Sequence, residues 1–314
     1  LHSLRRRQRQ MCIRDRVWTS NKGLITVIDL YSGNILLQKN VTGIIEGPIA
    51  VGNIDSDPTV EVLVGSYGGH LYCFDGSNFE LEWTFDVDNV GTYTDILSGA
   101  TLYKFNGKTY ILVATASHWN TGTNYVYLLN ASGSLIWRQT VDGSVSASIA
   151  VGFLDTHKND PVILVGSWSN NIYLIGFDNG TILGTIPVSA DVGAPPSFLD
   201  IDLDGRIESV WVTNGCGSGT GNVTLVDHDG SVIWSRNYGD TADIITSGDL
   251  NGDGQYDIVV HVFTPENSLL LIDAYTGELI QLIASSINRY ILGDVDNDLE
   301  TCLLYTSPSP RDRG

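Results

Sequence analysis

The chain has 314 residues, of which 17 % are charged, and its formal net charge is −19. This excess of acidic residues argues against a nucleic-acid partner, because phosphate contacts are made mainly by Lys and Arg. No run of 18 apolar residues occurs, so no membrane span is predicted in this chain. The low charged fraction and the 34 glycines favour short strands and tight turns.

The two ends of the chain differ from the part between them. Residues 1–16 and 301–314 hold eight of the 17 basic residues, and neither segment fits the repeat described below. Both resemble translated adapter sequence, so we expect them to be foreign and disordered. Residues 17–300 are therefore even more acidic than the whole chain, which favours bound cations or a saline surrounding, with solubility as the plainer explanation.

One unit recurs six times between residues 17 and 300, at intervals of about 45–55 residues. Each unit has an apolar strand, a polar Gly/Asp/Ser turn and a second strand. The first strands are predicted, in chain order, at 24–29, 71–75, 126–130, 172–176, 223–227 and 269–273. Three of the second strands carry Trp at one position, which we expect to be structural: Trp83, Trp137 and Trp234. This period indicates an all-β fold, a β-propeller of four-stranded sheets.

The fifth unit with all four strands, at 244–282, shows the plan of one sheet, or blade, and is called the fifth unit below. We predict strand A at 244–248, strand B at 258–263, strand C at 269–273 and strand D at 278–282. Runs of Val, Ile and Leu bounded by Gly, Asp and Asn are typical of packed strands. The acidic segment 249–257 joins strand A to strand B.

The number of strands predicts six blades. The first unit, from Val17, supplies strands B, C and D, whereas the last, 289–300, supplies only strand A. Pairing the last A strand with the first unit would close a six-bladed ring without exposed sheet edges. The alternative is a fragment of a seven- or eight-bladed ring.

The loops between strands A and B carry oxygen-bearing side chains at a fixed spacing. Positions 1, 3, 5 and 9 are occupied by Asn53, Asp55, Asp57 and Glu61; by Asp200, Asp202, Asp204 and Glu208; and by Asp249, Asn251, Asp253 and Asp257. A fourth, unfinished copy has Asp294, Asp296 and Asp298. Alternate residues of a tight loop point inward, and Ca²⁺ takes six to eight oxygen ligands, so we predict structural calcium sites. Turn formation by Asp, Asn and Gly is the alternative.

The loops differ from the helix-flanked EF-hand, which needs Glu at position 12. Trp211 and Val260 occupy that position here, and strands flank the loops. Two further A–B connections lack the pattern, and we expect no ion there. One has Phe153 and Pro161 at positions 1 and 9, and the other, 102–106, has no acidic residue.

These loops resemble FG-GAP repeats, the calcium-loop blades of integrin α-chains and of many prokaryotic surface proteins. The stretches at 64–75 (VGSYGGHLYCFD) and 165–175 (VGSWSNNIYLI) also resemble quinoprotein-like (PQQ-like) repeats. The resemblance implies a propeller over about 17–300 with the loop residues above as calcium ligands. Asn53 stands where an acid is usual and Pro58 replaces the usual Gly, so we expect the first complete site to be the weakest.

Enzyme families share this fold, and two alternatives follow from the resemblance. Quinoprotein dehydrogenases often use adjacent Cys residues, which this sequence lacks. A polysaccharide lyase would need a basic proton abstractor, and the basic residues of 17–300 are scattered. We therefore predict a non-catalytic role, with a lyase acting on acidic glycans as the main alternative.

A binding face is predicted from aromatic residues in or beside the B–C loops, which emerge opposite the acidic loops. They are Trp18, Tyr67, Trp119, Trp168 and Phe263. Aromatic rings give large contact area at low entropic cost, so we expect a protein or glycan ligand there. Packing between blades is the alternative. The combined hypothesis is a calcium-stabilised adhesion or scaffold module at the cell surface or outside the cell.

Overall fold

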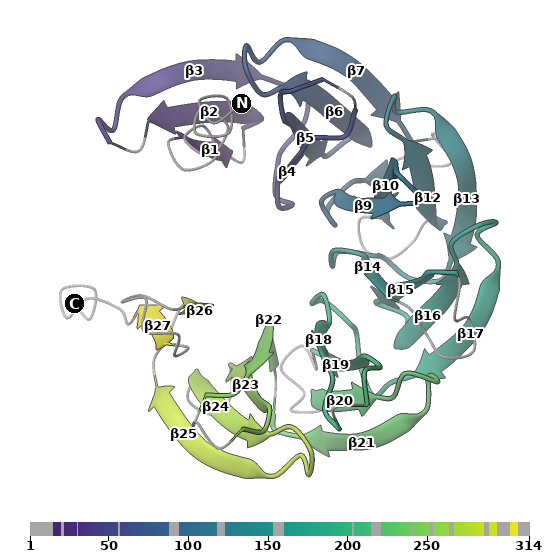
Figure 1. The fold of residues 1–314 in the computed structure, drawn as a ribbon, viewed down its shortest axis with the longest axis vertical. Helices are drawn as coiled ribbons and strands as arrows, with labels where there is room; N and C mark the ends of the chain where they lie inside the picture. The colour runs from purple at the N-terminus through teal and green to yellow at the C-terminus, as the bar shows by residue number, and fades with distance from the viewer. Residues whose placement is uncertain are drawn as a thin grey trace. The chain divides into compact units, whose positions relative to one another are not determined.

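The computed structural model describes part of the chain, shown as a coloured ribbon in Figure 1. The described residues are 15–19, 22–29, 31–55, 57–87, 94–117, 123–152, 160–202, 204–214, 221–239, 241–250, 254–263, 267–285, 289–293 and 302–306. They form strands and turns, and no helix able to cross a membrane occurs among them. Two compact units divide the chain, Leu1–Ser146 and Ala147–Gly314.

The first unit contains three successive antiparallel sheets and one small pair of strands. The first sheet has three strands, β1 (Asp15–Thr19), β2 (Leu24–Asp29) and β3 (Ile35–Asn40). The second has four, β4 (Ala50–Gly52), β5 (Glu61–Ser66), β6 (His70–Asp75) and β7 (Leu81–Asp86). The third is β9 (Thr101–Phe105), β10 (Lys108–Ala114), β12 (Asn124–Asn130) and β13 (Leu135–Val141). Beside it, β8 (Thr94–Asp95) pairs with β11 (Ala116–Ser117).

The second unit repeats the four-stranded plan three times. Its sheets are β14 (Ala150–Gly152), β15 (Val162–Ser167), β16 (Asn171–Gly176) and β17 (Ile182–Pro187); β18 (Ser197–Leu199), β19 (Glu208–Val212), β20 (Asn222–Val226) and β21 (Val232–Asn237); and β22 (Thr241–Gly248), β23 (Asp257–Val262), β24 (Ser268–Asp273) and β25 (Leu279–Ser285). A last pair joins β26 (Arg289–Gly293) to β27 (Cys302–Thr306).

The predicted blade plan is confirmed in five sheets, whose strands run A, B, C, D in order, while the first sheet has only B, C and D. In the fifth unit strand A begins three residues earlier than expected, at Thr241. Strand β27 lies within 301–314, and β1 begins inside 1–16. The ring-closing pairing of the last A strand with the first sheet would join the two units and stays a prediction.

The central strands of each sheet are buried because both of their faces are covered. Every residue of β5, β15 and β23 is buried, and each strand contains a run of three or four Val, Ile and Leu residues. Strand D, in contrast, begins with exposed residues, as in β13 and β21. A strand packed on both faces needs apolar side chains at successive positions rather than at alternate ones.

A one-residue β-bulge lies in every C–D pair. In the second sheet, for example, Cys73 pairs with Trp83 and the next residue, Phe74, pairs with Leu81, so Glu82 is the extra residue. The extra residues near the start of strand D are Leu36, Glu82, Ile136, Leu183, Ile233 and Ile280. The last four-stranded sheet has a second extra residue, Ile283, farther along the strand. A bulge bends its strand and redirects a side chain, so a bulge position differs from ordinary strand positions.

The A–B connection of the third sheet is shorter than expected, because most of 102–106 belongs to strand β9 (Thr101–Phe105). β9 and β10 are joined by a two-residue turn in which Asn106 and Gly107 have φ of 50° and 75°. Positive φ at both positions is the geometry of a tight hairpin that suits Asn-Gly.

Candidate cation-binding loops

Three acidic A–B loops contain described residues. We call them loop 1 (53–61, between β4 and β5), loop 2 (200–208, between β18 and β19) and loop 3 (249–257, between β22 and β23). In all three, the carboxylate at position 9 accepts a hydrogen bond from the backbone N–H at position 2. The donor–acceptor pairs are Ile54–Glu61 at 2.7 Å, Ile201–Glu208 at 2.8 Å and Leu250–Asp257 at 3.1 Å. Strand B thus fixes each loop by the same contact.

A second contact is shared by loops 2 and 3. The N–H of Gly205 donates to Asp200 Oδ2, and that of Gly254 donates to Asp249 Oδ2, both at 3.0 Å. The two glycines have φ of 84° and 82°, and a Cβ added at either would meet nothing within 4 Å. Glycine is therefore required for its backbone conformation rather than for space.

Loop 1 is built differently at these positions. Pro58 stands at position 6 and has no N–H to donate, and Asn53 stands at position 1. The Asn53 side-chain nitrogen donates to the carbonyl oxygens of Asp57 and Thr59, both at 2.6 Å. At position 1 of loop 1, the Asn53 side chain thus donates hydrogen bonds to backbone carbonyls. The predicted calcium loop would instead use a side-chain oxygen at this position as a ligand.

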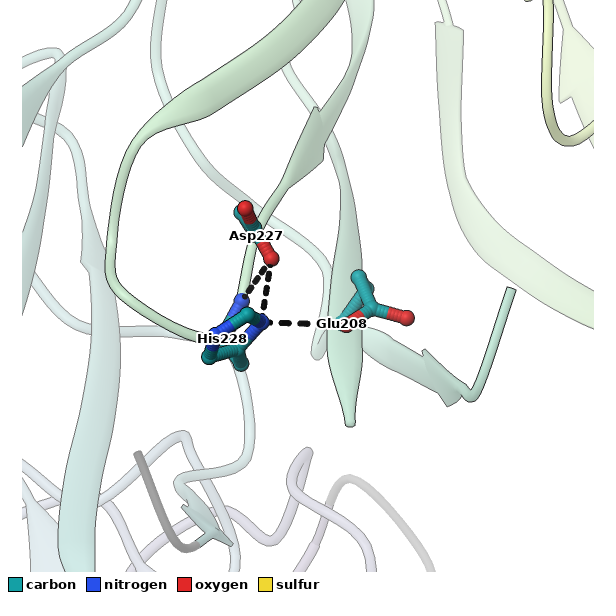
Figure 2. A group of neighbouring side chains, drawn as sticks. All are labelled: Glu208, Asp227 and His228. Carbon is teal, nitrogen blue, oxygen red and sulfur yellow. Dashed lines mark hydrogen bonds and ion pairs between the residues drawn. The ribbon is translucent and has the colours of Figure 1, made fainter. Parts of the chain in front are cut away.

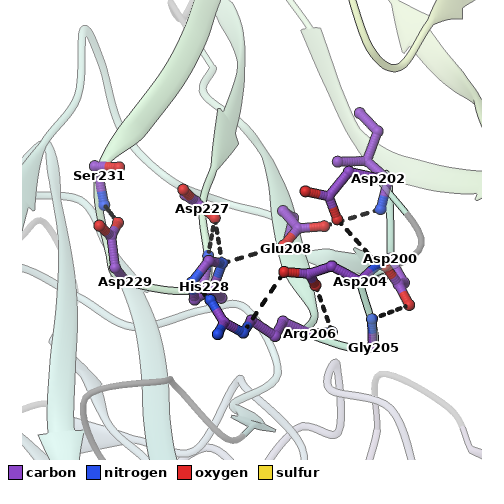
Figure 3. A network of polar contacts seen from close by, with 11 residues as sticks. Asp200, Asp202, Asp204, Gly205, Arg206, Glu208, Asp227, His228, Asp229 and Ser231 are labelled. Atoms are coloured by element: carbon purple, nitrogen blue, oxygen red, sulfur yellow. Dashed lines mark hydrogen bonds and ion pairs between the residues drawn. The ribbon is translucent and has the colours of Figure 1, made fainter.

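Carboxylates converge in loops 1 and 2. Ligand atoms of Asp200, Asp202 and Glu208 all lie within 4.8 Å of one another. Figure 3 draws these three residues with their neighbours. The Oδ1 atom of Asp200 is buried and has no hydrogen-bond partner. Unpaired buried carboxylate oxygens that face other carboxylates are unfavourable unless a cation compensates them. These residues therefore fit a hard divalent cation.

Asp204, the remaining predicted ligand of loop 2, faces Arg206 instead. Its Oδ1 accepts a hydrogen bond from the backbone N–H of Arg206 at 2.8 Å, and its Oδ2 lies 3.5 Å from Arg206 Nε. The structure thus brings together three of the four residues predicted for this site.

Burial changes the acidity of Glu208, the carboxyl at position 9 of loop 2. Burial, followed by the nearby Asp202, Asp227 and Asp200, raises the pKa of Glu208 above its usual value, although the N–H of Ile201 opposes the shift. The ionised form is therefore costly in the absence of a cation.

A neighbouring group joins loop 2 to the C–D turn of the same sheet. Figure 2 shows His228 between Asp227 and Glu208, with Nδ1 at 2.5 Å and 3.6 Å from their oxygens. Arg206 Nη1 lies 2.9 Å from His228 Nε2 (Figure 3). Because guanidinium can only donate, Nε2 accepts and Nδ1 carries the proton directed at Asp227. Arg206, His228 and Asp227 thus form a chain of hydrogen bonds that lies beside Glu208 without a hydrogen bond to it. Ligand atoms of Glu208, Asp227 and His228 also lie within 4.8 Å of one another.

The remaining predicted residues have different outcomes. Asp55 and Glu61 of loop 1 converge, whereas Asp57 accepts hydrogen bonds from the N–H and hydroxyl of Thr59. Five predicted ligands lie outside the described residues: Asn251, Asp253, Asp294, Asp296 and Asp298. Phe153, of the A–B connection where we expected no ion, also lies outside them.

Among the predicted binding-face aromatics, two are exposed. Trp168 is 38 % exposed and Phe263 is 48 % exposed. Tyr67 is half-buried, and its hydroxyl donates to Glu46. Trp18 is described only as a backbone position in β1, and Trp119 lies outside the described residues.

The sequence analysis did not predict Glu82, whose ligand atom lies within 4.8 Å of those of Asp55 and Glu61. It also did not predict the hydrogen bonds that link Arg206, His228 and Asp227. Comparing the six repeats at the position before the Trp of strand D would have found Glu82, since the other five have Leu or Ile there. Nothing in the spacing of His228 signals its contact with Glu208.

No known family matches the sequence, and no curated protein matches it either. Solved structures do match. BBS1N in complex with ARL6DN is 14 % identical, with a TM-score of 0.60 over 93 % of this chain and 83 % of that one. Sqt1 from Saccharomyces cerevisiae is 13 % identical, with a TM-score of 0.66 over 93 % and 78 %. A europium-containing methanol dehydrogenase is 9 % identical, with a TM-score of 0.63 over 86 % and 69 %.

These structures are propellers, and at such low identity the likeness shows the fold alone. Together with the successive four-stranded antiparallel sheets, it defines this chain as a β-propeller.

Proposed function

We propose that this propeller is a non-catalytic binding module and that its acidic loops hold Ca²⁺ as a structural ion. The main support is the convergence of Asp200, Asp202 and Glu208 around a buried carboxylate oxygen that lacks a partner. Asp249 and Asp257 hold the same two backbone contacts in loop 3, which gives the two loops one design.

The proposed role of Ca²⁺ is to neutralise the repulsion between the carboxylates of a loop. Two carboxylates about 4 Å apart repel each other by on the order of 4 kcal/mol at a near-surface effective dielectric. Bound Ca²⁺ would neutralise this repulsion and cross-link the start of strand B to the loop before it. Extracellular calcium modules have dissociation constants of about 10⁻⁴–10⁻³ M. A tenfold excess of Ca²⁺ would then add roughly 1.4 kcal/mol of stability per site.

The binding role is supported by the exposed Trp168 and Phe263, since large exposed aromatic rings often anchor partners. A propeller of the same fold, BBS1N, has been solved in complex with ARL6DN. We propose a protein or glycan partner for this chain and, from its acidic surface and calcium loops, a location outside the cell or on its surface.

The direct test is thermal unfolding of the cation-depleted chain. We expect EDTA to lower the Tm and millimolar Ca²⁺ to restore it, with less effect from Mg²⁺, which prefers few protein ligands. An unchanged Tm would contradict the calcium proposal. New ultraviolet absorbance on acidic polysaccharides, or quinone-dependent dye reduction, would contradict the non-catalytic one and favour a lyase or a quinoprotein-type dehydrogenase.

A further inference from the structure

Glu82 is an acidic residue at a position that is otherwise aliphatic. It is the bulge residue of the C–D pair in the second sheet. The equivalent residues of the other five sheets are Leu36, Ile136, Leu183, Ile233 and Ile280, all of them exposed. An acid at this position thus distinguishes the sheet that contains loop 1.

The bulge directs Glu82 toward loop 1. Ligand atoms of Asp55, Glu61 and Glu82 lie within 4.8 Å of one another, so strand D adds a third carboxylate to two from the loop. The Cys73 thiol, from the neighbouring strand β6, lies 3.5 Å from Glu82 Oε2. No basic side chain joins this group among the ion pairs described for the chain.

Glu61 is the buried member of this group, and one of its two oxygens has no hydrogen-bond partner among the described residues. Its side chain is 0 % exposed, and while Oε2 accepts the N–H of Ile54, Oε1 is buried with no hydrogen-bond partner. A fully buried carboxylate that has an unpaired oxygen and lies within 4.8 Å of two further carboxylates is stabilised by a bound cation.

The Asn53 side chain fills the place inside loop 1 where the predicted calcium site would lie. The Asn53 amide nitrogen donates to the carbonyl oxygens of Asp57 and Thr59. A cation and an N–H group compete for the same oxygen lone pairs, so an ion at that place would have to displace Asn53. Asp57 Oδ1 accepts two hydrogen bonds, from the N–H and the hydroxyl of Thr59, whereas Asp55 Oδ1 accepts one, from the N–H of Asp57 at 2.7 Å.

We propose that the second sheet carries a calcium site of different composition, with Asp55, Glu61 and Glu82 as ligands and with Asn53 and Asp57 outside the coordination shell. Three hard carboxylate groups can supply up to six oxygens, which suits Ca²⁺. The inference rests on the proposed structural role of Ca²⁺ but not on occupancy of loops 2 and 3.

Carboxyl footprinting tests this site residue by residue. The cation-depleted chain is labelled with a carbodiimide and an amine, with and without Ca²⁺ at ten times the dissociation constant, and peptides are analysed by mass spectrometry. We expect Ca²⁺ to lower the labelling of Glu82 about tenfold, since about one site in eleven remains empty. Glu80, an exposed acid on the same hairpin, should be labelled equally in both states.

The variants Glu82→Gln and Glu82→Ile provide a second measurement, with Glu80→Gln as the matched control. Both Glu82 variants should bind one Ca²⁺ fewer by calorimetry than the control does, and Ile matches the residue type of the other sheets. Protection of Asp202 without protection of Glu82 would overturn this inference and leave the calcium proposal for loop 2. Protection of neither would overturn both, and protection of Glu82 alone would support this site and contradict loop 2.

Discussion

Trp234 of strand β21 lies against Gly277 in the C–D turn of the next sheet. A Cβ added at Gly277 would come within 2.8 Å of the indole Cδ2, and the indole N–H donates to the carbonyl of Ala274 at 3.0 Å. Trp83 and Gly133 form the same contact in the first unit, where the added Cβ would lie 2.5 Å from the ring. One junction between successive sheets in each unit is thus made by a Trp on a turn glycine, and the structural role expected for these two Trp residues is confirmed.

Gly277→Ala should destabilise the protein by two separable effects. Its φ of 68° strains an L-residue by about 1 kcal/mol, and overpacking against Trp234 adds about 1–3 kcal/mol. Urea unfolding of the variant measures the sum. The control is Gly33→Ala, at an equivalent turn with φ of 70° and nothing within 4 Å of an added Cβ. Equal losses in the two variants would show that the Trp contact contributes nothing.

Asp202→Asn should reduce the stabilisation that Ca²⁺ provides, because it removes one charge from the converging group of loop 2. We expect the Tm gain between EDTA and millimolar Ca²⁺ to shrink, by the equivalent of up to roughly 1.4 kcal/mol. Asp178→Asn, at an exposed turn residue, is the control and should keep the full gain. The same gain in both variants would show that loop 2 contributes no site.

Asp191 should make the stability of the protein depend on pH, and this effect does not involve the acidic loops. Burial raises the pKa of its carboxyl above the usual 3.8, so the native state holds the proton more tightly than the unfolded chain does. Its favourable contribution is therefore present below pH 3.8 and lost as the pH rises through the raised value.

Asp191→Asn should accordingly stabilise the protein at pH 7 and have little effect at pH 3.5. The measurement is the difference in unfolding free energy between variant and wild type as a function of pH. The exposed Asp160, changed to Asn, is the control. A difference that stays constant with pH would show that burial of Asp191 does not perturb its titration.

Trp168→Ala and Phe263→Ala should weaken partner binding while leaving the Tm nearly unchanged, because both side chains are substantially exposed. Binding is measured on a glycan array and against candidate surface proteins. Tyr275→Ala removes an exposed aromatic from a C–D turn and should bind as the wild type does. Loss of stability without loss of binding would indicate that Trp168 packs between sheets.

Much of the fold could be predicted because the same pattern of apolar strands and polar turns recurs in every unit. Strand C of the fifth unit was expected at 269–273 and is found at Ser268–Asp273. The acids at position 9 were also predictable, since their spacing from the preceding Asp is fixed within a loop. Gly205 and Gly254 were expected to need unusual dihedrals, and their positive φ confirms this.

The sites could be predicted less well, because they depend on contacts between segments distant in sequence. Glu82 reaches Asp55 only through a bulge, and a bulge is a property of strand register rather than of residue spacing. The diversion of Asp204 to Arg206 and the placement of the Asn53 nitrogen depend on side-chain directions within one loop. Spacing identifies oxygen-bearing residues but not what each oxygen faces.

Calorimetric titration of the cation-depleted chain with Ca²⁺ tests the central claim most directly. The account predicts saturable binding at submillimolar to millimolar concentration with more than one site per chain, reduced by Asp202→Asn and, separately, by Glu82→Gln. A titration that shows no saturable heat at millimolar Ca²⁺, in a chain that is folded by circular dichroism, would contradict it.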